Sequence, residues 1–405
     1  MHRTERFSFE GANGHKLDGR LELPRYGSPR ACAIFAHCFT CGKDSRAATT
    51  IARALAEKGI GVLRFDFAGL GGSEGDFASF ATQVDDLCAA ADALADKGYP
   101  PELLIGHSLG GAAVIAAANE VPSVKAIATI GAPSDTDHVL HNLGDGIEEI
   151  EMAGEATVKI AGRDFFVKKE FVERTRGQLQ EDRLKALAKP LLVMHAPTDE
   201  LVAIDHARKI FEAAMHPKSF VALDGADHLL MDPKQARYAA DIISAWADKY
   251  APEMDEDHVQ RPLDGTIRVE TAGGKFAQWV TTPTHRFIAD EPVSYGGLDD
   301  GPTPYDLLLG ALGTCTSMTI KMYADYKKIP LDHVAVELEH SRDHGEDQKS
   351  DVEGGDKMIQ VIDRHIRLSG DFDEAQRKKL IEIADKCPVH RTLEGELHIH
   401  TTAED

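Results

Sequence analysis

Short apolar runs alternate with stretches of helical periodicity over the first 250 residues of the chain. The apolar runs, which we predict to be strands, cover residues 31–36, 60–65, 103–105, 124–130, 191–194 and 219–223. The stretches between them have the spacing of amphipathic helices at residues 45–58, 80–97, 108–119, 205–214 and 233–249. Strands that alternate with helices form a parallel sheet that is covered on both faces. The pattern therefore predicts a doubly wound, mostly parallel α/β domain over residues 1–250.

Two segments of this domain depart from the alternation. Residues 5–23 contain two alternating stretches around Asn13 and Gly14, which predicts an antiparallel hairpin at the sheet edge. Residues 147–167 resemble short strands around Gly154 and Gly162, followed by charged helical sequence. We predict that residues 134–187 form a small cap over the sheet, although their length fits an ordinary connection equally well.

The pattern changes after an acidic, proline-containing stretch at residues 251–262, which we predict to be a linker. Residues 263–405 then predict a smaller α+β domain with helices packed on one strongly curved antiparallel sheet. Its expected strands are residues 266–269, 276–280, 334–340, 359–368 and 396–401, and its expected helices are residues 304–327 and 373–386.

Composition and charge narrow the range of partners. The chain has 405 residues, of which 42% are hydrophobic, and a formal net charge of −22. Such a charge repels phosphate backbones and anionic lipids, so we expect neither nucleic acid nor a membrane as a partner. The N-terminal residues lack the apolar core of a secretory signal, so we expect a cytoplasmic protein. Six cysteines are few for this length, and any reactive thiol is expected to be catalytic or redox-sensing.

A serine lies between the apolar run that ends at residue 105 and the helix that follows it. The sequence Gly106-His107-Ser108-Leu109-Gly110 has the G-x-S-x-G pattern of a nucleophile elbow, in its required strand–turn–helix setting. The glycines are needed because bulk at either position would collide with the neighbouring strand or helix. We therefore predict that Ser108 is a nucleophile.

A serine nucleophile needs a base and an acid that orients the base. With this elbow the partners follow in the order acid, then histidine. Asp199 follows the run at residues 191–194, and His228 follows the run at residues 219–223, so we assign these two roles to them. Asp224 and Asp227 are the competing acids. The N–H groups of Leu109 and Phe39 are the expected oxyanion donors.

Together with His37-Cys38-Phe39 and the stretch at residues 66–73, these residues resemble the α/β-hydrolase family over about residues 5–250. The resemblance implies an esterase, lipase, thioesterase or peptidase that needs no cofactor. The family usually has glycine at the position of Cys38. A side chain there crowds the acyl site, so we expect short acyl groups.

Cys38 and Cys41 have C-x-x-C spacing, which is typical of packing residues, a redox pair or half of a zinc site. The chain has no second C-x-x-C, so we predict no metal site. We favour packing beside the oxyanion loop, and a redox lock on the hydrolase stays open as the alternative.

Cys315 and Cys387 are the two cysteines of the second domain. Two thiols that are close in space can reduce a peroxide through a sulfenic acid and a disulfide, but two buried structural cysteines fit the spacing equally well. Residues 303–309, followed by Cys315 and by Cys387-Pro388-Val389, resemble the OsmC/Ohr family over about residues 262–404.

The second resemblance implies a thiol-dependent peroxidase for organic hydroperoxides that is built as an intertwined homodimer and uses a thiol reductant. Carried over, Cys315 is peroxidatic and Cys387 is resolving, with Arg286 as a weakly supported thiolate partner. Tyr305 replaces the family's glutamate, and we interpret Asp306 as part of a helix capping box with Thr303. We therefore expect a bifunctional ester hydrolase and peroxidase. In the alternative, the second domain serves dimerisation or ligand binding.

Overall fold

The structure is a computed structural model that describes residues 2–38, 41–75, 80–135, 146–160, 163–169, 172, 180–251, 261–344 and 358–403. The chain divides into two compact units, Met1–Gln260 and Arg261–Asp405. None of the described helices is long and apolar enough to cross a membrane.

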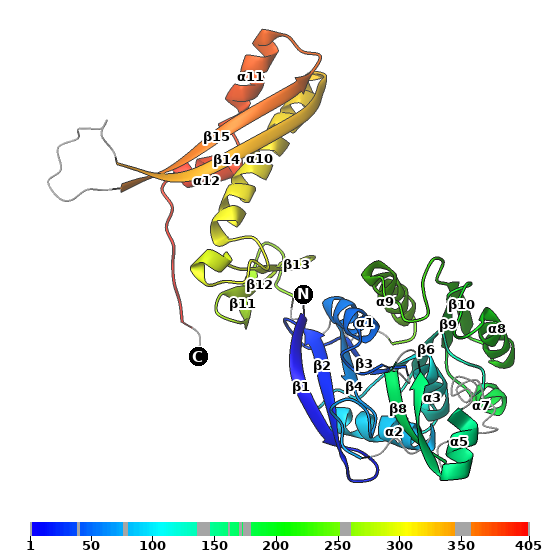
Figure 1. Ribbon diagram of the computed structural model, residues 1–405. Coiled ribbons are helices and arrows are strands. Elements are labelled where there is room, and N and C mark those ends of the chain that lie inside the picture. Colours follow the sequence, from blue (N-terminus) through cyan, green and yellow to red (C-terminus); the bar gives the residue numbers. More distant parts are fainter. Residues whose placement is uncertain are drawn as a thin grey trace. The chain divides into compact units, whose positions relative to one another are not determined.

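The first unit is built on an eight-stranded sheet with the order β1-β2-β4-β3-β5-β6-β9-β10 (Figure 1). β1 and β2 form the predicted antiparallel hairpin at one edge, β2 pairs antiparallel with β4, and the other pairs are parallel. The predicted mostly parallel sheet is thereby confirmed. The strands are β1 His2–Glu10, β2 Lys16–Pro24, β3 Ala31–Ala36, β4 Ile60–Phe65, β5 Leu103–His107, β6 Ala126–Ile130, β9 Leu191–His195 and β10 Lys218–Ala222.

Helices bury an apolar core against each face of this sheet. One core contains residues of α2, α3 and α8, and the other contains residues of α1 and α9. The parallel strands β3, β5, β6 and β9 are buried at every position, which follows from having helices on both faces. These helices are α1 Arg46–Glu57, α2 Phe80–Asp96, α3 Leu109–Ala117, α8 Ile204–Ala213 and α9 Pro233–Ala247.

The segment after β6 differs in detail from the prediction. Its first part is a helix, α5 Gly146–Ala153, and not a strand. A hairpin of β7 Glu155–Ile160 and β8 Arg163–Lys168 follows, and then α7 Glu181–Ala186. The apolar residues at the start of this segment recur three and four apart, which is the helical spacing. Ile150 and Val158 are buried in the core that α2 and α3 line, so this segment packs on the main sheet unit.

The second unit contains two separate antiparallel sheets, whereas the sequence predicts one. β11 Arg268–Gly273, β12 Ala277–Thr281 and β13 Arg286–Ala289 form the first sheet, and β14 Leu331–His344 pairs with β15 Met358–Gly370 in the second. The helix α10 Pro304–Lys327 lies between them in the chain. A helix of that length is roughly 36 Å long, and it separates the two sheets along the chain.

The end of the second unit corrects a further prediction. Residues 396–401 are not a strand: all six are exposed, and within the described chain they pair with no strand. Without a partner strand, the backbone N–H and C=O groups of an extended segment bond only to water, so no inter-strand hydrogen bonds stabilise the extended form. After α11 Glu374–Ala384 the chain instead forms a short helix, α12 Pro388–Glu394, which the sequence analysis missed. A proline at its first position was the available signal.

Candidate active site

Ser108 occupies a strained turn between β5 and α3. Its φ of 56° and ψ of −124° lie outside the regions that side-chain-bearing residues ordinarily adopt. The neighbouring glycines make the turn possible. A Cβ on Gly106 would collide with the backbone of Gly110, and a Cβ on Gly110 would collide with the carbonyl oxygen of Ala36. The predicted packing reason for the two glycines is therefore confirmed.

The structure brings the three predicted catalytic residues of the first unit together. Nε2 of His228 lies 3.0 Å from the Ser108 hydroxyl oxygen, and its Nδ1 lies 2.7 Å from Oδ2 of Asp199. The second Asp199 oxygen, Oδ1, accepts the N–H groups of Leu201 at 2.9 Å and Val202 at 2.8 Å. Burial alone raises the pKa of Asp199, but these hydrogen bonds, with that of His228 the largest, hold the pKa below its usual value. Asp199 is therefore a buried carboxylate whose charge is well satisfied.

The competing acid Asp227 has a different role in the structure. Its carboxylate accepts the backbone N–H of Leu229 at 2.8 Å and that of Met231 at 3.0 Å. These bonds close the turn that follows His228. The acid in contact with the imidazole of His228 is Asp199.

His107, which the sequence analysis did not single out, connects the elements around Ser108. Its Nε2–H donates to the carbonyl oxygen of His228 at 2.7 Å, and its ring centroid lies 5.4 Å from that of the His228 ring. Its side chain is buried, and burial lowers the pKa of His107 to about 4, so the ring is neutral. The only sequence signal was its position inside the elbow.

Of the two predicted oxyanion donors, one can be placed. Leu109 is the first residue of α3, and the N–H groups of the first helical turn have no partner within the helix. Phe39 lies outside the described residues.

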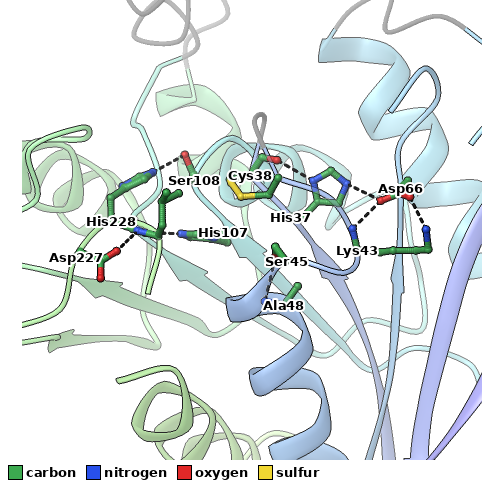
Figure 2. The surroundings of a disulfide bond; sticks show 12 residues. His37, Cys38, Lys43, Ser45, Ala48, Asp66, His107, Ser108, Asp227 and His228 are labelled. Atoms are coloured by element: carbon green, nitrogen blue, oxygen red, sulfur yellow. Dashed lines mark hydrogen bonds and ion pairs between the residues drawn. A yellow bond between two sulfur atoms is a disulfide. The ribbon is translucent and has the colours of Figure 1, made fainter. Parts of the chain in front are cut away.

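Cys38 and Cys41, for which the sequence favours packing, form a disulfide instead. The physical reason is a tight turn: the Cys41 N–H donates to the Cys38 carbonyl oxygen at 3.1 Å, which brings the two Cα atoms to 5.1 Å. Figure 2 shows the disulfide with Ser108, His107 and His228 on one side and His37, Lys43 and Asp66 on the other. One ligand atom each from Cys38, Cys41 and His107 lie within 4.8 Å of one another, so the reduced pair and His107 could hold a metal ion.

The two cysteines of the second unit also lie close together. Cys315 is on α10 and half-buried, and Cys387 is buried at the start of α12, where its Sγ accepts the His390 N–H at 3.3 Å. Burial raises the pKa of Cys387, but hydrogen bonds from the His390 N–H, the Cys315 thiol and the Thr316 hydroxyl outweigh it and lower the pKa. These hydrogen bonds therefore stabilise the thiolate of Cys387.

An arginine that the sequence analysis missed lies beside these thiols. Arg364 of β15 donates to the Thr316 hydroxyl at 3.1 Å, to the Ala384 carbonyl oxygen at 3.4 Å and to the Asp385 carboxylate at 2.6 Å. These contacts connect the residue after Cys315 with the segment before Cys387. No local motif marks Arg364, because the three contacts come from elements far apart in the sequence.

The other predicted residues of this region are placed as follows. The guanidinium of Arg286 lies over the Trp279 ring, 3.8 Å from its centroid. Tyr305 is stacked on His340 with the ring centroids 4.4 Å apart. Asp306 and Thr303 form the predicted capping box, since each side chain accepts the other's backbone N–H.

Comparisons with known proteins match the two units of the chain to two different families. Residues 33–242 match the family described as "Alpha/beta hydrolase family", and residues 297–402 match "OsmC-like protein". The solved esterase domain of a Rhodothermus marinus protein is 47% identical, with a TM-score of 0.53, and covers 62% of this chain and 99% of that one. Est1E from Butyrivibrio proteoclasticus is 20% identical with a TM-score of 0.51, over 60% of this chain and 98% of its own, and supports the fold alone.

A curated protein is also similar to part of this chain. Palmitoyl-protein thioesterase ABHD10, mitochondrial, of Rattus norvegicus is 27% identical over 226 residues, which are 53% of this chain and 75% of the relative. The first family match spans more than half of the chain, and its residues form the sheet and elbow described above. The chain therefore belongs to the alpha/beta hydrolase family and carries an OsmC-like region in its second unit.

Proposed function

We propose that the first unit hydrolyses carboxylic esters, with Ser108 as nucleophile, His228 as general base and Asp199 as the acid that orients the base. One observation carries the proposal: the Ser108 hydroxyl lies 3.0 Å from Nε2 of His228, whose Nδ1 lies 2.7 Å from Asp199. In this geometry the imidazole takes the serine proton while the oxygen attacks an acyl carbon.

The reaction then follows from the groups around Ser108. The attack leaves a negative charge on the carbonyl oxygen, which we expect the N–H groups of Leu109 and Phe39 to bind. Collapse releases the alcohol, which takes its proton from the His228 imidazolium, and leaves an acyl-serine. Water attacks the acyl-serine with the same base, and the carboxylic acid departs.

The relatives and the residue at position 38 indicate which kind of ester the site accepts. The esterase domain at 47% identity supports oxygen esters, and the thioesterase relative at 27% identity makes acyl thioesters the second candidate. Cys38 stands where the family usually has glycine, and it is bonded to Cys41. We therefore expect a p-nitrophenyl ester series to favour acetyl and butyryl over decanoyl and palmitoyl groups. A preference for palmitoyl esters or for a palmitoyl thioester would contradict this expectation.

The nucleophile is tested by Ser108→Ala. The variant should lose turnover of p-nitrophenyl acetate and labelling by a fluorophosphonate, because no other hydroxyl lies in the elbow. Ser123→Ala is the matched control, since the Ser123 hydroxyl donates to the Pro101 carbonyl oxygen on a surface turn and should leave both readouts unchanged. An unchanged rate in Ser108→Ala would remove the assignment.

The base is tested by His228→Ala. The variant should lose turnover of p-nitrophenyl acetate, because the Ser108 hydroxyl then lacks the imidazole that takes its proton. An unchanged rate would contradict the role of His228.

For the second unit we propose thiol-dependent reduction of organic hydroperoxides. A thiolate attacks one peroxide oxygen, the O–O bond breaks, and the products are a sulfenic acid and an alcohol. The second thiol condenses with the sulfenic acid to a disulfide and water, and an external dithiol restores both thiols. The proximity of Cys315 and Cys387 supports this chemistry. We assign the attack to Cys315, because it is half-buried whereas Cys387 is buried.

The roles of the two thiols can be separated by trapping. In Cys387→Ser, a hydroperoxide should leave a sulfenic acid on Cys315 that dimedone labels. If dimedone instead labels Cys387 in Cys315→Ser and nothing in the first variant, the roles are reversed, in keeping with the lowered pKa of Cys387. Unchanged peroxide consumption in both variants would leave dimerisation or ligand binding as the role of this unit.

The long helix of the second unit supports a homodimer. Met318, Met322 and Tyr326 recur every four residues on α10 and are 64%, 72% and 78% exposed. Side chains at this spacing share one face of a helix, and such an apolar stripe is costly in water. We expect light scattering to give twice the mass of one chain. Met322→Glu should shift the mass to that of the monomer, and a monomeric wild type would contradict the proposal.

A further inference from the structure

The disulfide beside Ser108 takes no part in the bond-making and bond-breaking steps of ester hydrolysis described above. We propose that Cys38–Cys41 is a redox site that exchanges with small dithiols, and that its closed form is the state competent for hydrolysis. This inference rests on the proposed function of Ser108. The sequence left two roles open for this pair: packing beside the oxyanion loop, or a redox lock on the hydrolase. The inference selects the redox role.

The first support is that His107 lies near the disulfide and also near the proposed catalytic residues. Sulfur atoms of the pair and a ring nitrogen of His107 lie within 4.8 Å of one another. His107 directly precedes Ser108 in the chain, and its Nε2–H holds the carbonyl oxygen of His228 at 2.7 Å (Figure 2). One buried ring therefore separates the disulfide from both the nucleophile and the base.

The second support is how the surrounding loop is held. The Cys38 carbonyl oxygen accepts the Nδ1–H of His37 at 2.7 Å and the Cys41 N–H at 3.1 Å. Beyond Cys41, the Lys43 N–H and Nζ each lie 2.6 Å from an oxygen of Asp66, an anchor that does not depend on the sulfurs. The disulfide thus joins Cys38 to a part of the chain that is anchored independently of the sulfurs.

The third support is unequal access to the two sulfurs. Cys38 is 2% exposed, whereas Cys41 is half-buried and lines a cavity of about 700 Å³. Leu229, the residue after the proposed base, and Met231 line the same cavity. A small thiol that enters this cavity therefore reaches Cys41 before Cys38.

A small dithiol that reaches Cys41 can open the pair in two exchange steps. A thiolate of the dithiol attacks Sγ of Cys41, and the bond between the two protein sulfurs breaks, which leaves Cys38 as a thiolate that takes a proton from water. The second thiol of the reagent then attacks its own mixed-disulfide sulfur and releases Cys41. The protein gains two electrons and two protons, and the dithiol becomes a cyclic disulfide. The reverse reaction with oxidised dithiol closes the pair again.

Opening the pair changes the packing beside His107. Two sulfurs that are no longer bonded must move apart to van der Waals distance, in a region where Cys38 and His107 are both buried. The move displaces the ring whose Nε2–H holds the His228 carbonyl oxygen. Displacement of catalytic groups by about 1 Å costs up to about 10²-fold in rate, so we expect kcat/KM to fall at least about tenfold on reduction.

The test equilibrates the full chain in buffers with different ratios of reduced to oxidised dithiothreitol. Alkylation followed by mass spectrometry reports the state of each cysteine, and kcat/KM for p-nitrophenyl acetate is measured on the same samples. We expect activity and closure of Cys38–Cys41 to share one midpoint and to recover together on reoxidation. The Cys38→Ser, Cys41→Ser double variant should have the low rate at every ratio, with its fold checked by circular dichroism. Cys88→Ser, which removes a half-buried cysteine of α2, should keep the full response.

Each contrary result has a distinct meaning. A pair that stays closed in excess dithiothreitol, or activity that does not change when alkylation shows the pair open, overturns the redox site and leaves the hydrolase proposal intact. Absence of turnover and of fluorophosphonate labelling at Ser108 in both states overturns the hydrolase proposal and the coupling with it.

Discussion

The buried imidazole of His107 should make the first unit lose stability in mild acid. In the folded state burial lowers the pKa of His107 from 6.5 to about 4. In the unfolded chain the ring is in water and has the ordinary value. Between these two values the unfolded chain therefore binds a proton that the folded chain does not bind. The neutral ring therefore costs the folded state nothing above about pH 7. As the pH falls from there toward 4, the free energy of unfolding decreases.

The size of the loss follows from the shift. At 1.36 kcal/mol per pKa unit, linkage gives a loss of about 2 kcal/mol at pH 5 and about 3 kcal/mol at pH 4. His107→Gln is the matched variant, because a glutamine amide can donate near the position of Nε2 without titrating. The variant should be less stable than the wild type at pH 7. It should lack the part of the stability loss in acid that comes from His107.

The assay is urea unfolding at pH 7, 6, 5 and 4.5 in a Trp279→Phe background, so that Trp246 reports on the first unit alone. Protonation of carboxylates lowers the free energy of unfolding of both proteins in acid. The difference between the two curves therefore isolates the contribution of His107. The two free energies of unfolding should converge by about 2 kcal/mol between pH 7 and pH 5. Parallel curves over that range would refute the reasoning.

Three further predictions concern single contacts. Gly110→Ala should abolish ester hydrolysis, because its Cβ would collide with the backbone of the strand that ends at residue 36; a wild-type rate would contradict the described elbow. Asp199→Asn should lower kcat by orders of magnitude, whereas Asp227→Asn should keep kcat within a few-fold, since only Asp199 contacts the imidazole; equal losses in p-nitrophenyl acetate assays would contradict the assignment. Thr303→Ala should cost the second unit about 1 kcal/mol in thermal unfolding through loss of the α10 cap, and an unchanged midpoint would contradict the capping role.

The sequence by itself determined the elements whose signals are local. Alternating apolar runs and helices were enough to predict the parallel sheet, because the periodicity of a strand or helix depends on nearby residues. The turn that carries Ser108 was predicted for the same reason: its two glycines and its strand–turn–helix setting lie within a few residues. The helix at residues 304–327 was predicted with its cap, since Thr303 and Asp306 are three residues apart.

Tertiary structure decided what depends on residues far apart in the chain. His107 became a link between the elbow and His228 only when folding brought its ring to a carbonyl 121 positions away. Arg364 gained its place beside the thiols through contacts with two other elements, and residues 396–401 failed to form a strand because no partner edge was available within the described chain. The spacing of Cys38 and Cys41 allowed packing, zinc binding or a disulfide, and the turn that brings their Cα atoms to 5.1 Å selected the last of these.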